Sequence, residues 1–385
     1  MTGAEIVIVG AGVMGASVAW HLATMGAKSI LLLDRGAEAG TGSTGRATGG
    51  FRSQYASGAN VRLSRLSREK LLRFREETGG DAAYQPHGYL FLATSDAHLA
   101  ILRDAQAVQH SEGAREATML SVDDVPRLQP HVLLDEVVGA AFCPTDGFMR
   151  PLGILAGYLA AAERLGAQVR WEADVTGVDR RGNRIVALRT ATDTIGCDVV
   201  VNAAGAWANT VSGFAGSQLP VVPVRRQVLA TVPTNALPPS TPMTIFTGDN
   251  FHFRVRDGRV LMLLPLDTPR QNPFDTGFEA SWAQEVVSRA HARVPVLRDV
   301  AVDLAASWAG LYEMSPDHHA ILGRAPGCDN LYLINGSSGH GVMHSPALGQ
   351  LLAEEMLGRP KALDTYPFRP ERFAEGAPNP APVLL

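Results

Sequence analysis

Glu5-Ile-Val-Ile-Val-Gly-Ala-Gly-Val-Met-Gly15 decides the fold, because a short β-branched run leads directly into three spaced glycines. Such a run predicts a parallel strand buried on both faces, and Ala16–Met25 after it reads as a helix closed by Gly26. Gly10 permits a tight turn, Gly12 lets a pyrophosphate approach the backbone, and Gly15 lets the helix pack closely on the strand. The stretch therefore predicts a strand–turn–helix unit that binds a dinucleotide.

A second apolar run, Ser29-Ile-Leu-Leu-Leu33, ends on Asp34. The helix N-terminus at Val13 and Met14 offers free N–H groups to phosphates. Asp34 lies near the expected spacing of about 20 residues, where a carboxylate accepts hydrogen bonds from the adenosine ribose. This order of elements favours a dinucleotide over a glycine-rich turn that binds nothing, but it does not separate NAD from FAD. Arg35 suits an NADP site, although such an arginine is more often a solvated residue at a strand end.

The bulk composition excludes several classes of protein. The chain has 385 residues, a formal net charge of −4 and 46% hydrophobic residues, so it offers no basic surface for nucleic acid or an anionic membrane. Cys143, Cys197 and Cys328 form no C-x-x-C pair, so we expect no disulfide framework, no metal site and a cytoplasmic protein. Ile6–Met25 is long and nearly uncharged, but its glycines predict a strand and a helix rather than a membrane span.

Three later stretches favour FAD. The first is Gly40-Thr-Gly-Ser-Thr-Gly-Arg-Ala-Thr-Gly-Gly-Phe-Arg52, whose backbone suits a long cofactor and whose Ser43 or Thr44 could donate to phosphate. The second is the apolar run Asp198–Asn202, which ends in the small residues Ala203–Gly205 before Trp207.

The third stretch is a second strand–glycine loop–helix unit near the end of the chain. Leu331–Asn335 reads as a strand, Gly336-Ser-Ser-Gly-His-Gly-Val-Met343 as the loop, and the helix continues to about Leu357. The positive end of that helix suits the negative charge of a reduced flavin.

Together these stretches resemble the D-amino-acid-oxidase-like superfamily of FAD-dependent oxidoreductases over nearly the whole chain. Within it the chain is most similar to sarcosine oxidase β subunits and to catalytic subunits of dye-linked L-proline dehydrogenase. Besides the glycine loops and Asp34, the resemblance rests on Gly88–Leu92, Ala141–Gly147, Ser307–Asp317 and Gly339–His344.

The resemblance implies an α/β fold in which a Rossmann-like FAD-binding domain (GR2-type flavoprotein) carries an antiparallel-sheet substrate domain. The FAD domain would comprise 1–85, 141–215 and 305–385, and the substrate domain 86–140 and 216–304. Strand-like runs support this division, and Asp257-Gly258 signals a hairpin between two of them. The runs are Tyr89–Ala93, Gln227–Val232, Phe251–Val255 and Arg259–Leu263.

The motifs and the resemblance together assign a set of cofactor-binding residues. These are Gly10, Gly12, Val13, Met14, Gly15, Asp34, Arg35, Ser43, Thr44, Arg46, Ala47, Thr48, Gly49, Val175, Ala204, Gly205, Trp207, Gly310, Gly339, His340, Gly341, Val342 and Met343. At His340 we expect the backbone to matter more than the ring.

Departures from the family pattern predict that the FAD is not covalently bound. Gly310 stands where monomeric sarcosine oxidases carry a flavin-bonding cysteine, and Arg46 stands where dimethylglycine-dehydrogenase-like members carry a histidine. Phe148–Leu152 contains no histidine to bond a second flavin, FMN.

The resemblance implies oxidation of the C–N bond of a small, secondary amine or amino acid, such as sarcosine or proline, to an imine. Arg52 matches an arginine close to the flavin, although a surface arginine that steadies the loop is the alternative. Tyr312 replaces an arginine that clamps the substrate carboxylate in glycine-oxidase-like relatives, and a tyrosine cannot reproduce a bidentate clamp. Either carboxylate binding moves elsewhere or the substrate has no carboxylate.

Histidines supply the remaining candidates. His344 stands where sarcosine oxidases have a lysine that serves carboxylate binding, but a helix N-terminus disfavours its cationic form. His252 and Arg254 alternate on one strand, so they face either the flavin or solvent together. Adjacent His318 and His319 predict no metal site.

Other functions stay open. One is a tailoring amine oxidase or desaturase for substrates without a free carboxylate, and another is a non-catalytic flavin-binding subunit of a hetero-oligomer. An NAD-dependent dehydrogenase is the least favoured reading, because it gives no function to the glycine-rich loops Gly40–Arg52 and Gly336–Met343. The electron acceptor is oxygen or another compound. In sarcosine oxidases a lysine in the substrate sheet activates oxygen. The only lysines of this chain are Lys28, Lys70 and Lys361, and all of them lie outside that segment. A homo-oligomer is also open.

Overall fold

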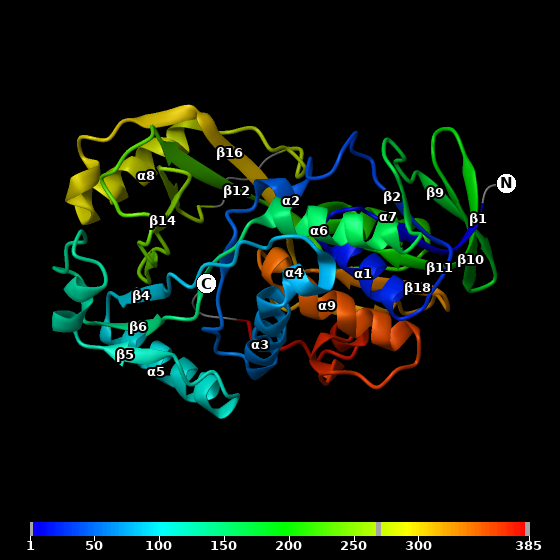
Figure 1. Cartoon of the computed structure of the whole chain (residues 1–385), viewed down its shortest axis with the longest axis horizontal. Coiled ribbons are helices and arrows are strands. Elements are labelled where there is room, and N and C mark those ends of the chain that lie inside the picture. The colour runs from blue at the N-terminus through cyan, green and yellow to red at the C-terminus, as the bar shows by residue number, and fades with distance from the viewer. Residues whose placement is uncertain (1–2, 267–270, 382–385) are drawn as a thin grey trace.

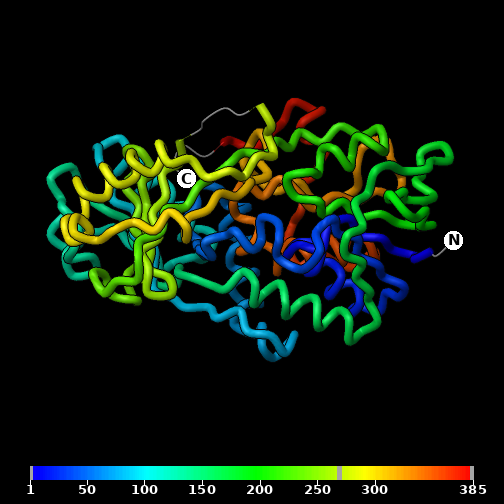
Figure 2. The backbone as a smooth tube through the Cα atoms, turned by 90° about the horizontal axis from the view of Figure 1, so that it is seen from above, coloured from blue at the N-terminus to red at the C-terminus, as the bar shows by residue number. Residues whose placement is uncertain are grey.

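Two eight-stranded sheets form opposite ends of an elongated molecule (Figure 1). The computed structural model describes residues 3–266 and 271–381. Seen from above, one end combines segments from the second quarter and the third quarter of the chain, while the N-terminus lies at the opposite end (Figure 2). The chain therefore passes between the two sheets repeatedly, as a discontinuous FAD domain requires.

The first sheet has a parallel core of the Rossmann kind. Its strand order is β17-β18-β11-β1-β2-β8, and β9 and β10 extend from β11 as an antiparallel hairpin. The strands are β1 (Gly3–Val9), β2 (Ile30–Leu33), β8 (Gln168–Arg170), β9 (Gly177–Arg181), β10 (Arg184–Arg189), β11 (Thr194–Asn202), β17 (Ile321–Arg324) and β18 (Leu331–Asn335).

Both faces of β1 are covered, which explains its uninterrupted apolar run. Ile6 and Ile8 pack among residues of helices α1 (Val13–Thr24), α6 (Pro151–Arg164) and α9 (Gly341–Met356). Val7 and Val9 point to the opposite face, where the β9–β10 hairpin and α7 (Ala208–Phe214) contribute the core. The predicted strand and helix within Ile6–Met25 are thus confirmed as β1 and α1. Among the described residues, no helix is both long enough and apolar enough to span a bilayer.

The second sheet has the order β16-β12-β15-β14-β13-β4-β6-β5 and is antiparallel except where β13 runs parallel to β4. Helices α5 (Asp96–Ser111) and α8 (Ala280–Arg293) pack against it. The strands are β4 (Tyr89–Ala93), β5 (Thr118–Leu120), β6 (Gly139–Cys143), β12 (Val222–Thr231), β13 (Met243–Phe246), β14 (His252–Arg256), β15 (Arg259–Leu263) and β16 (Val302–Met314).

Two expected domain borders fall inside strands of this sheet. Position 141 lies within β6, which pairs with β4 and β5, and position 305 lies within β16, which pairs with β12 as far as Met314. Because each of these strands pairs within the second sheet over its whole length, the chain returns to the FAD domain only after Cys143 and after Met314. The predicted hairpin at Asp257-Gly258 is confirmed, since both residues have positive φ, 54° and 70°, and join β14 to β15.

Shorter elements complete the fold. The glycine-rich stretch 40–52 forms a one-turn helix and a two-residue strand that pairs with β7. The helices are α2 (Ser43–Arg46), α3 (Gly58–Leu72) and α4 (Phe74–Thr78), and the short strands are β3 (Gly50–Phe51) and β7 (Gly147–Phe148). The 3-10 turns are η1 (Val122–Arg127), η2 (Gly205–Trp207), η3 (Pro295–Leu297), η4 (Tyr366–Phe368) and η5 (Pro370–Phe373).

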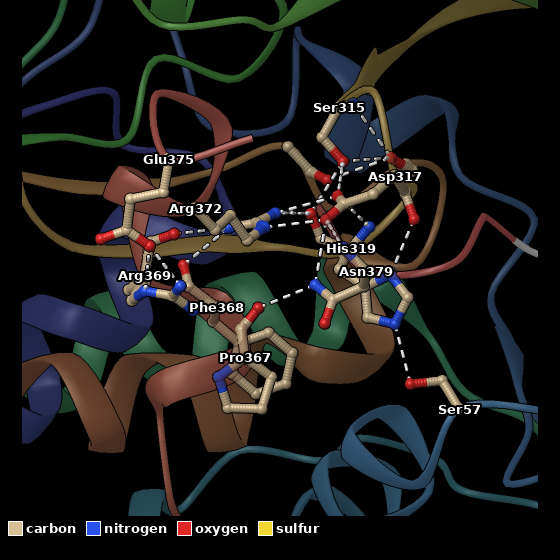
Figure 3. A network of polar contacts seen from close by, with 12 residues as sticks. Ser57, Ser315, Asp317, His319, Pro367, Phe368, Arg369, Arg372, Glu375 and Asn379 are labelled. Atoms are coloured by element: carbon tan, nitrogen blue, oxygen red, sulfur yellow. Dashed lines mark hydrogen bonds and ion pairs between the residues drawn. The ribbon is translucent and has the colours of Figure 1, made fainter. Parts of the chain in front are cut away.

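The Pro/Ala-rich tail after Arg372, which its composition predicts to be loose, is instead fixed as far as Asn379. The backbone N–H and the side-chain Nδ2 of Asn379 both donate to Asp317 Oδ2, at 3.0 and 2.9 Å, and Nδ2 also donates to Pro367 O (Figure 3). A buried carboxylate needs such donors, and composition alone does not reveal the partner. Residues 382–385 lie outside the described part of the chain.

Candidate functional site

A cavity of about 810 Å³ lies between the two sheets. Its floor is formed where the parallel strands β1, β2 and β11 end, which is the usual ligand edge of such a sheet. Its roof comes from the second sheet, with Tyr89, Arg226, His252 and Leu263 among the lining residues.

The first glycine turn is built as the motif predicts. A Cβ added to Gly10, whose φ is 103°, would lie 2.4 Å from Ala203 O, and one added to Gly15 would lie 1.9 Å from Gly10 O. Neither position admits a side chain. Gly15 does not line the cavity, so its role is the close packing of helix on strand, as predicted.

Asp34 fixes the loop from which α1 begins. Its Oδ2 accepts from Ala11 N at 2.7 Å and its Oδ1 from Gly36 N at 2.8 Å. Each oxygen keeps acceptor capacity toward the cavity, as a ribose contact requires. Asp34 thus holds the two loops together.

The hydroxyl groups of the second loop are already engaged. Thr44 Oγ1 accepts from Val13 N at 3.2 Å, in the first turn of α1, and Ser43 Oγ donates to Leu311 O at 2.8 Å. Both residues line the cavity. Because the Ser43 proton points to β16, the prediction that Ser43 or Thr44 donates to a phosphate now depends on Thr44.

Arg46 joins the same loop to β16. Its Nη1 donates to Ala309 O at 2.7 Å, and Trp308 Nε1 donates back to Arg46 O at 2.7 Å. A Cβ on Gly310 would lie 3.0 Å from Arg46 Cβ. The two positions that carry flavin-bonding side chains in relatives are therefore packed against each other.

An aromatic stack forms the part of the cavity wall that contains Arg35 and Trp207. The Arg35 guanidinium lies 4.7 Å from the centre of the Trp207 ring, and Trp207 stacks on Phe274 with ring centres 5.3 Å apart and planes 8° apart. Arg35 is thus held against a ring although it is exposed.

Every residue predicted to bind the cofactor lines the cavity, except Gly15. Among the residues predicted for the chemistry, Arg52, His252 and Tyr312 also line it.

Arg52 is a buried cation. Only 5% of it is exposed, and its guanidinium lies 4.3 Å from the centre of the Tyr55 ring. Its Nη2 donates to His340 Nε2 at 3.0 Å, and because a guanidinium cannot accept, the histidine is the acceptor. Burial first, and then the charge of Arg52, lower the pKa of His340. The surface-arginine alternative is therefore wrong, and the His340 ring has a task that the sequence did not suggest.

Asp146, from the Ala141–Gly147 motif, fixes the residues that follow Arg52. It is fully buried, and its Oδ1 accepts from both N and Oγ of Ser53 at 2.7 Å. Its Oδ2 accepts from Gln54 Nε2 at 3.1 Å, and that amide also donates to Tyr89 O. Burial raises the pKa of Asp146 to about 6, although these hydrogen bonds oppose the shift. Sequence reasoning recognised the motif without giving Asp146 a function.

The roof carries a neutral histidine, a tyrosine and a second arginine. His252 Nδ1 donates to Asn250 O at 2.7 Å, and burial, with help from Arg52 and Arg226, lowers its pKa to about 4. Burial raises the pKa of Tyr312, whose ring centre lies 5.7 Å from the Arg226 guanidinium.

Arg226 was not predicted. In the β12–β16 ladder it pairs with Gly310, two residues from Tyr312, where relatives have their arginine clamp. The only sequence signal was its position one residue before the expected strand Gln227–Val232.

Two predicted residues, Arg254 and His344, do not line the cavity. Arg254 Nη1 donates to Thr48 O at 2.6 Å, and its guanidinium lies 3.5 Å from the Phe148 ring centre. His344 Nε2 is 2.9 Å from Ser64 Oγ, and burial lowers its pKa to about 3. A neutral imidazole behind the cavity cannot take over the carboxylate binding expected of it.

Within residues 3–266 and 271–381, no three His, Cys, Asp or Glu side chains are grouped to hold a metal ion. His318 lines the cavity, whereas His319 points to Ser57 Oγ at 2.8 Å.

Comparison with known proteins agrees with this geometry. A family model described as DAO, FAD dependent oxidoreductase, matches residues 5–355. FAD-dependent oxidoreductase domain-containing protein 1 from Xenopus laevis is 27% identical over 96% of this chain and 82% of that protein. 4-methylaminobutanoate oxidase (formaldehyde-forming) from Paenarthrobacter nicotinovorans is 25% identical over 97% of this chain, which spans only 46% of that enzyme. The crystal structure of L-proline dehydrogenase from P. horikoshii is 27% identical, with a TM-score of 0.90 over 98% of this chain and 100% of that one.

Proposed function

This chain belongs to the DAO family of FAD-dependent oxidoreductases, and we propose that it oxidises the C–N bond of a small secondary amino acid, of the sarcosine or proline kind, to an imine. The observation that carries the proposal is the pair of arginines, Arg52 and Arg226, at the end of the cavity that also holds His252 and Tyr312. Bound FAD supplies the two-electron acceptor of the oxidation, and the protein supplies orientation and electrostatics.

The residues present fit FAD. The turn at Gly10 leaves no room for a side chain, and Gly12, Val13 and Met14 at the start of α1 line the cavity, although Val13 N already donates to Thr44 Oγ1. At the far end, α9 begins at Gly341, where its positive dipole suits a flavin edge that gains negative charge. Val175, Ala204 and Gly205 complete the wall with small or apolar surface.

A substrate carboxylate is the best partner for the two arginines. Arg52 is desolvated between Tyr55 and His340, and a buried cation gains most from a charged hydrogen-bond partner. Arg226 lies beside Tyr312, so a clamp that relatives place on β16 is supplied here by β12. This arrangement supports the alternative in which carboxylate binding has moved rather than disappeared, and so favours an amino acid over an amine without a carboxylate.

His252 and Tyr312 suit the amine end of the substrate. With Nδ1 donating to Asn250 O, the neutral His252 leaves Nε2 as an acceptor at physiological pH. Tyr312 keeps its proton and can donate. Such groups orient an amine in its neutral form, which the oxidation needs, without requiring a strong base.

We also infer that the electrons pass to an acceptor other than oxygen. No lysine of the described residues lines the cavity, and Arg254 is turned toward Thr48 O. Turnover with an artificial dye should exceed turnover with oxygen at equal substrate concentration. Equal rates with both acceptors would contradict this part of the proposal.

Anaerobic titration of the purified protein tests the function directly. Sarcosine, L-proline, D-proline and simple N-methylamines without a carboxylate are each added while the flavin absorption is recorded. We expect a carboxylated secondary amine to bleach the flavin band at lower concentration than its decarboxylated analogue. Bleaching by the uncarboxylated amines alone would support the tailoring alternative, and no bleaching by any of them would support a non-catalytic flavin-binding subunit.

A further inference from the structure

One carboxyl oxygen in the cavity wall has no partner. Glu313 Oε2 is buried and accepts no hydrogen bond within the described part of the chain. His21, Ser67, Asn335 and Ser337 share this property, but among these five residues only Glu313 lines the cavity. A buried acceptor that stays unsatisfied costs about 1–3 kcal/mol, so a ligand in the cavity is the natural partner for this oxygen.

Glu313 lies near the end of β16, between the two helix N-termini. Its Oε1 accepts from Ser337 N at 3.3 Å, and its backbone oxygen accepts from Ser338 N at 3.1 Å. A Cβ built on Gly341, the first residue of α9, would lie 3.9 Å from Glu313 Oε1 and 3.5 Å from Met14 Cε. The carboxyl group therefore sits where the start of α9 comes close to the first turn of α1.

The direction of FAD in the cavity follows from the other residues. Asp34 marks the adenosine end, and the first turn of α1 marks the pyrophosphate. Arg52, His252 and Tyr312 mark the flavin end, where the substrate must meet the ring. The part of the cofactor between pyrophosphate and flavin is the ribityl chain, which carries three uncharged hydroxyl groups.

We propose that Glu313 binds the ribityl chain of FAD, with Oε2 accepting a hydrogen bond from one of its hydroxyl groups. A hydroxyl donor matches the unpartnered acceptor, whereas the pyrophosphate, which has only acceptors and negative charge, does not. Burial raises the pKa of Glu313 to about 7 in the protein alone, although N–H groups of Ser337 and Gly336 oppose the shift. A donor that reaches Oε2 removes part of this desolvation cost.

The inference rests on FAD binding and not on the identity of the substrate. Its test is the dissociation constant of FAD from the apoprotein, followed by quenching of flavin fluorescence. FAD is compared with three analogues that each lack one ribityl hydroxyl, in the wild type and in Glu313→Gln and Glu313→Ala. A hydrogen bond to a charged group contributes about 1.5–3 kcal/mol, so one analogue should bind the wild type about 10- to 100-fold more weakly than FAD.

In Glu313→Ala that same analogue should bind almost as tightly as FAD, because the acceptor of the hydrogen bond has been removed. Glu313→Gln keeps a carbonyl acceptor without charge. The fold-loss in affinity of the analogue relative to FAD should therefore lie between the values for the wild type and for Glu313→Ala. Ser67→Ala is the matched control, since its unpartnered hydroxyl does not line the cavity and its FAD affinity should equal that of the wild type.

Two results would overturn the proposal. One is that all three analogues bind the wild type as tightly as FAD. The other is that each analogue binds more weakly than FAD by the same factor in the wild type and in Glu313→Gln. If Glu313→Ala does not fold, the comparison of wild type with Glu313→Gln still decides. Neither readout uses turnover, so failure of the amine-oxidation proposal would leave this test intact.

Discussion

Arg372 and Asp317 form a doubly hydrogen-bonded ion pair that solvent does not reach (Figure 3). Arg372 Nε donates to Asp317 Oδ2 at 2.8 Å and Nη2 donates to Oδ1 at 2.9 Å. The pair links the C-terminal segment to the chain just before His318, which lines the cavity.

Removing one member of this pair leaves a buried charge. We expect Arg372→Met to lower the free energy of unfolding by about 3–5 kcal/mol, measured by urea denaturation at pH 7. Arg369→Met is the matched control, because Arg369 pairs with the half-exposed Glu375. This replacement should lower the free energy of unfolding by at most about 1 kcal/mol. Equal losses in the two variants would contradict the importance of the buried pair.

The same pair predicts a pH dependence. Although burial alone would raise it, the hydrogen bonds and charge of Arg372 and the N–H groups of Asn379 hold the pKa of Asp317 well below its usual range. A depressed carboxyl pKa contributes stability above the unfolded value of about 3.9, and this contribution is lost as the pH falls toward the folded value. The stability difference between wild type and Asp317→Asn should therefore shrink below about pH 4. A difference that stays constant from pH 7 to pH 3 would argue against this.

Arg226 should control affinity rather than rate. In Arg226→Met we expect KM for a carboxylated substrate to rise about 10- to 100-fold with little change in kcat, because a charged hydrogen bond to the carboxylate is lost in ground and transition state alike. A decarboxylated amine serves as the control, since its KM should be unaffected. A large fall in kcat with unchanged KM would place Arg226 in the chemistry instead.

Asp146 should act through Arg52. Asp146→Asn replaces one carboxylate oxygen by an NH₂ group that cannot accept from Gln54 Nε2, so the segment that carries Arg52 loses an anchor. We expect several-fold weaker binding of small carboxylates, measured by their perturbation of the flavin spectrum, with FAD still bound. Ser53→Ala keeps the N–H donor to Oδ1 and should have a smaller effect. A lower melting temperature without weaker carboxylate binding would mean that Asp146 is only structural.

The FAD should be released by denaturation. Gly310 and Arg46 offer no nucleophile where relatives bond the flavin, and Arg46 is held by Ala309 O. After precipitation with acid, we expect all of the flavin absorption in the supernatant. Flavin that stays with the pellet would show a covalent bond and contradict the prediction.

The floor of the site could be predicted because its constraints are local. A positive φ at Gly10 and the absence of space at Gly15 are consequences of residue type, so the glycine spacing reveals them. The position of Asp34 could be predicted for the same reason, because it ends the second strand of this short unit.

The roof could not be predicted in the same way, because it depends on pairing between distant strands. Arg226 enters the site only through the β12–β16 ladder, in which its partner Gly310 lies 84 residues further along the sequence. Alternation correctly put His252 and Arg254 on one face of β14, but Phe148 and Thr48 O occupy the space before Arg254. His344 follows Met343 on a helix, where successive side chains diverge by about 100°, and so faces α3 instead of the cavity.

Strand β16 has a consequence for recombining this enzyme with its relatives. Ser43, Arg46 and Trp308 connect the strand to the loop of residues 40–52, while Tyr312 on the same strand faces the substrate end. A chimera that exchanges a roof including β16 would join two halves whose hydrogen bonds were never matched. Crossover points that leave 302–314 with the residues 40–52 of the same parent should yield folded hybrids, so substrate range can be transplanted only up to the edge of this strand.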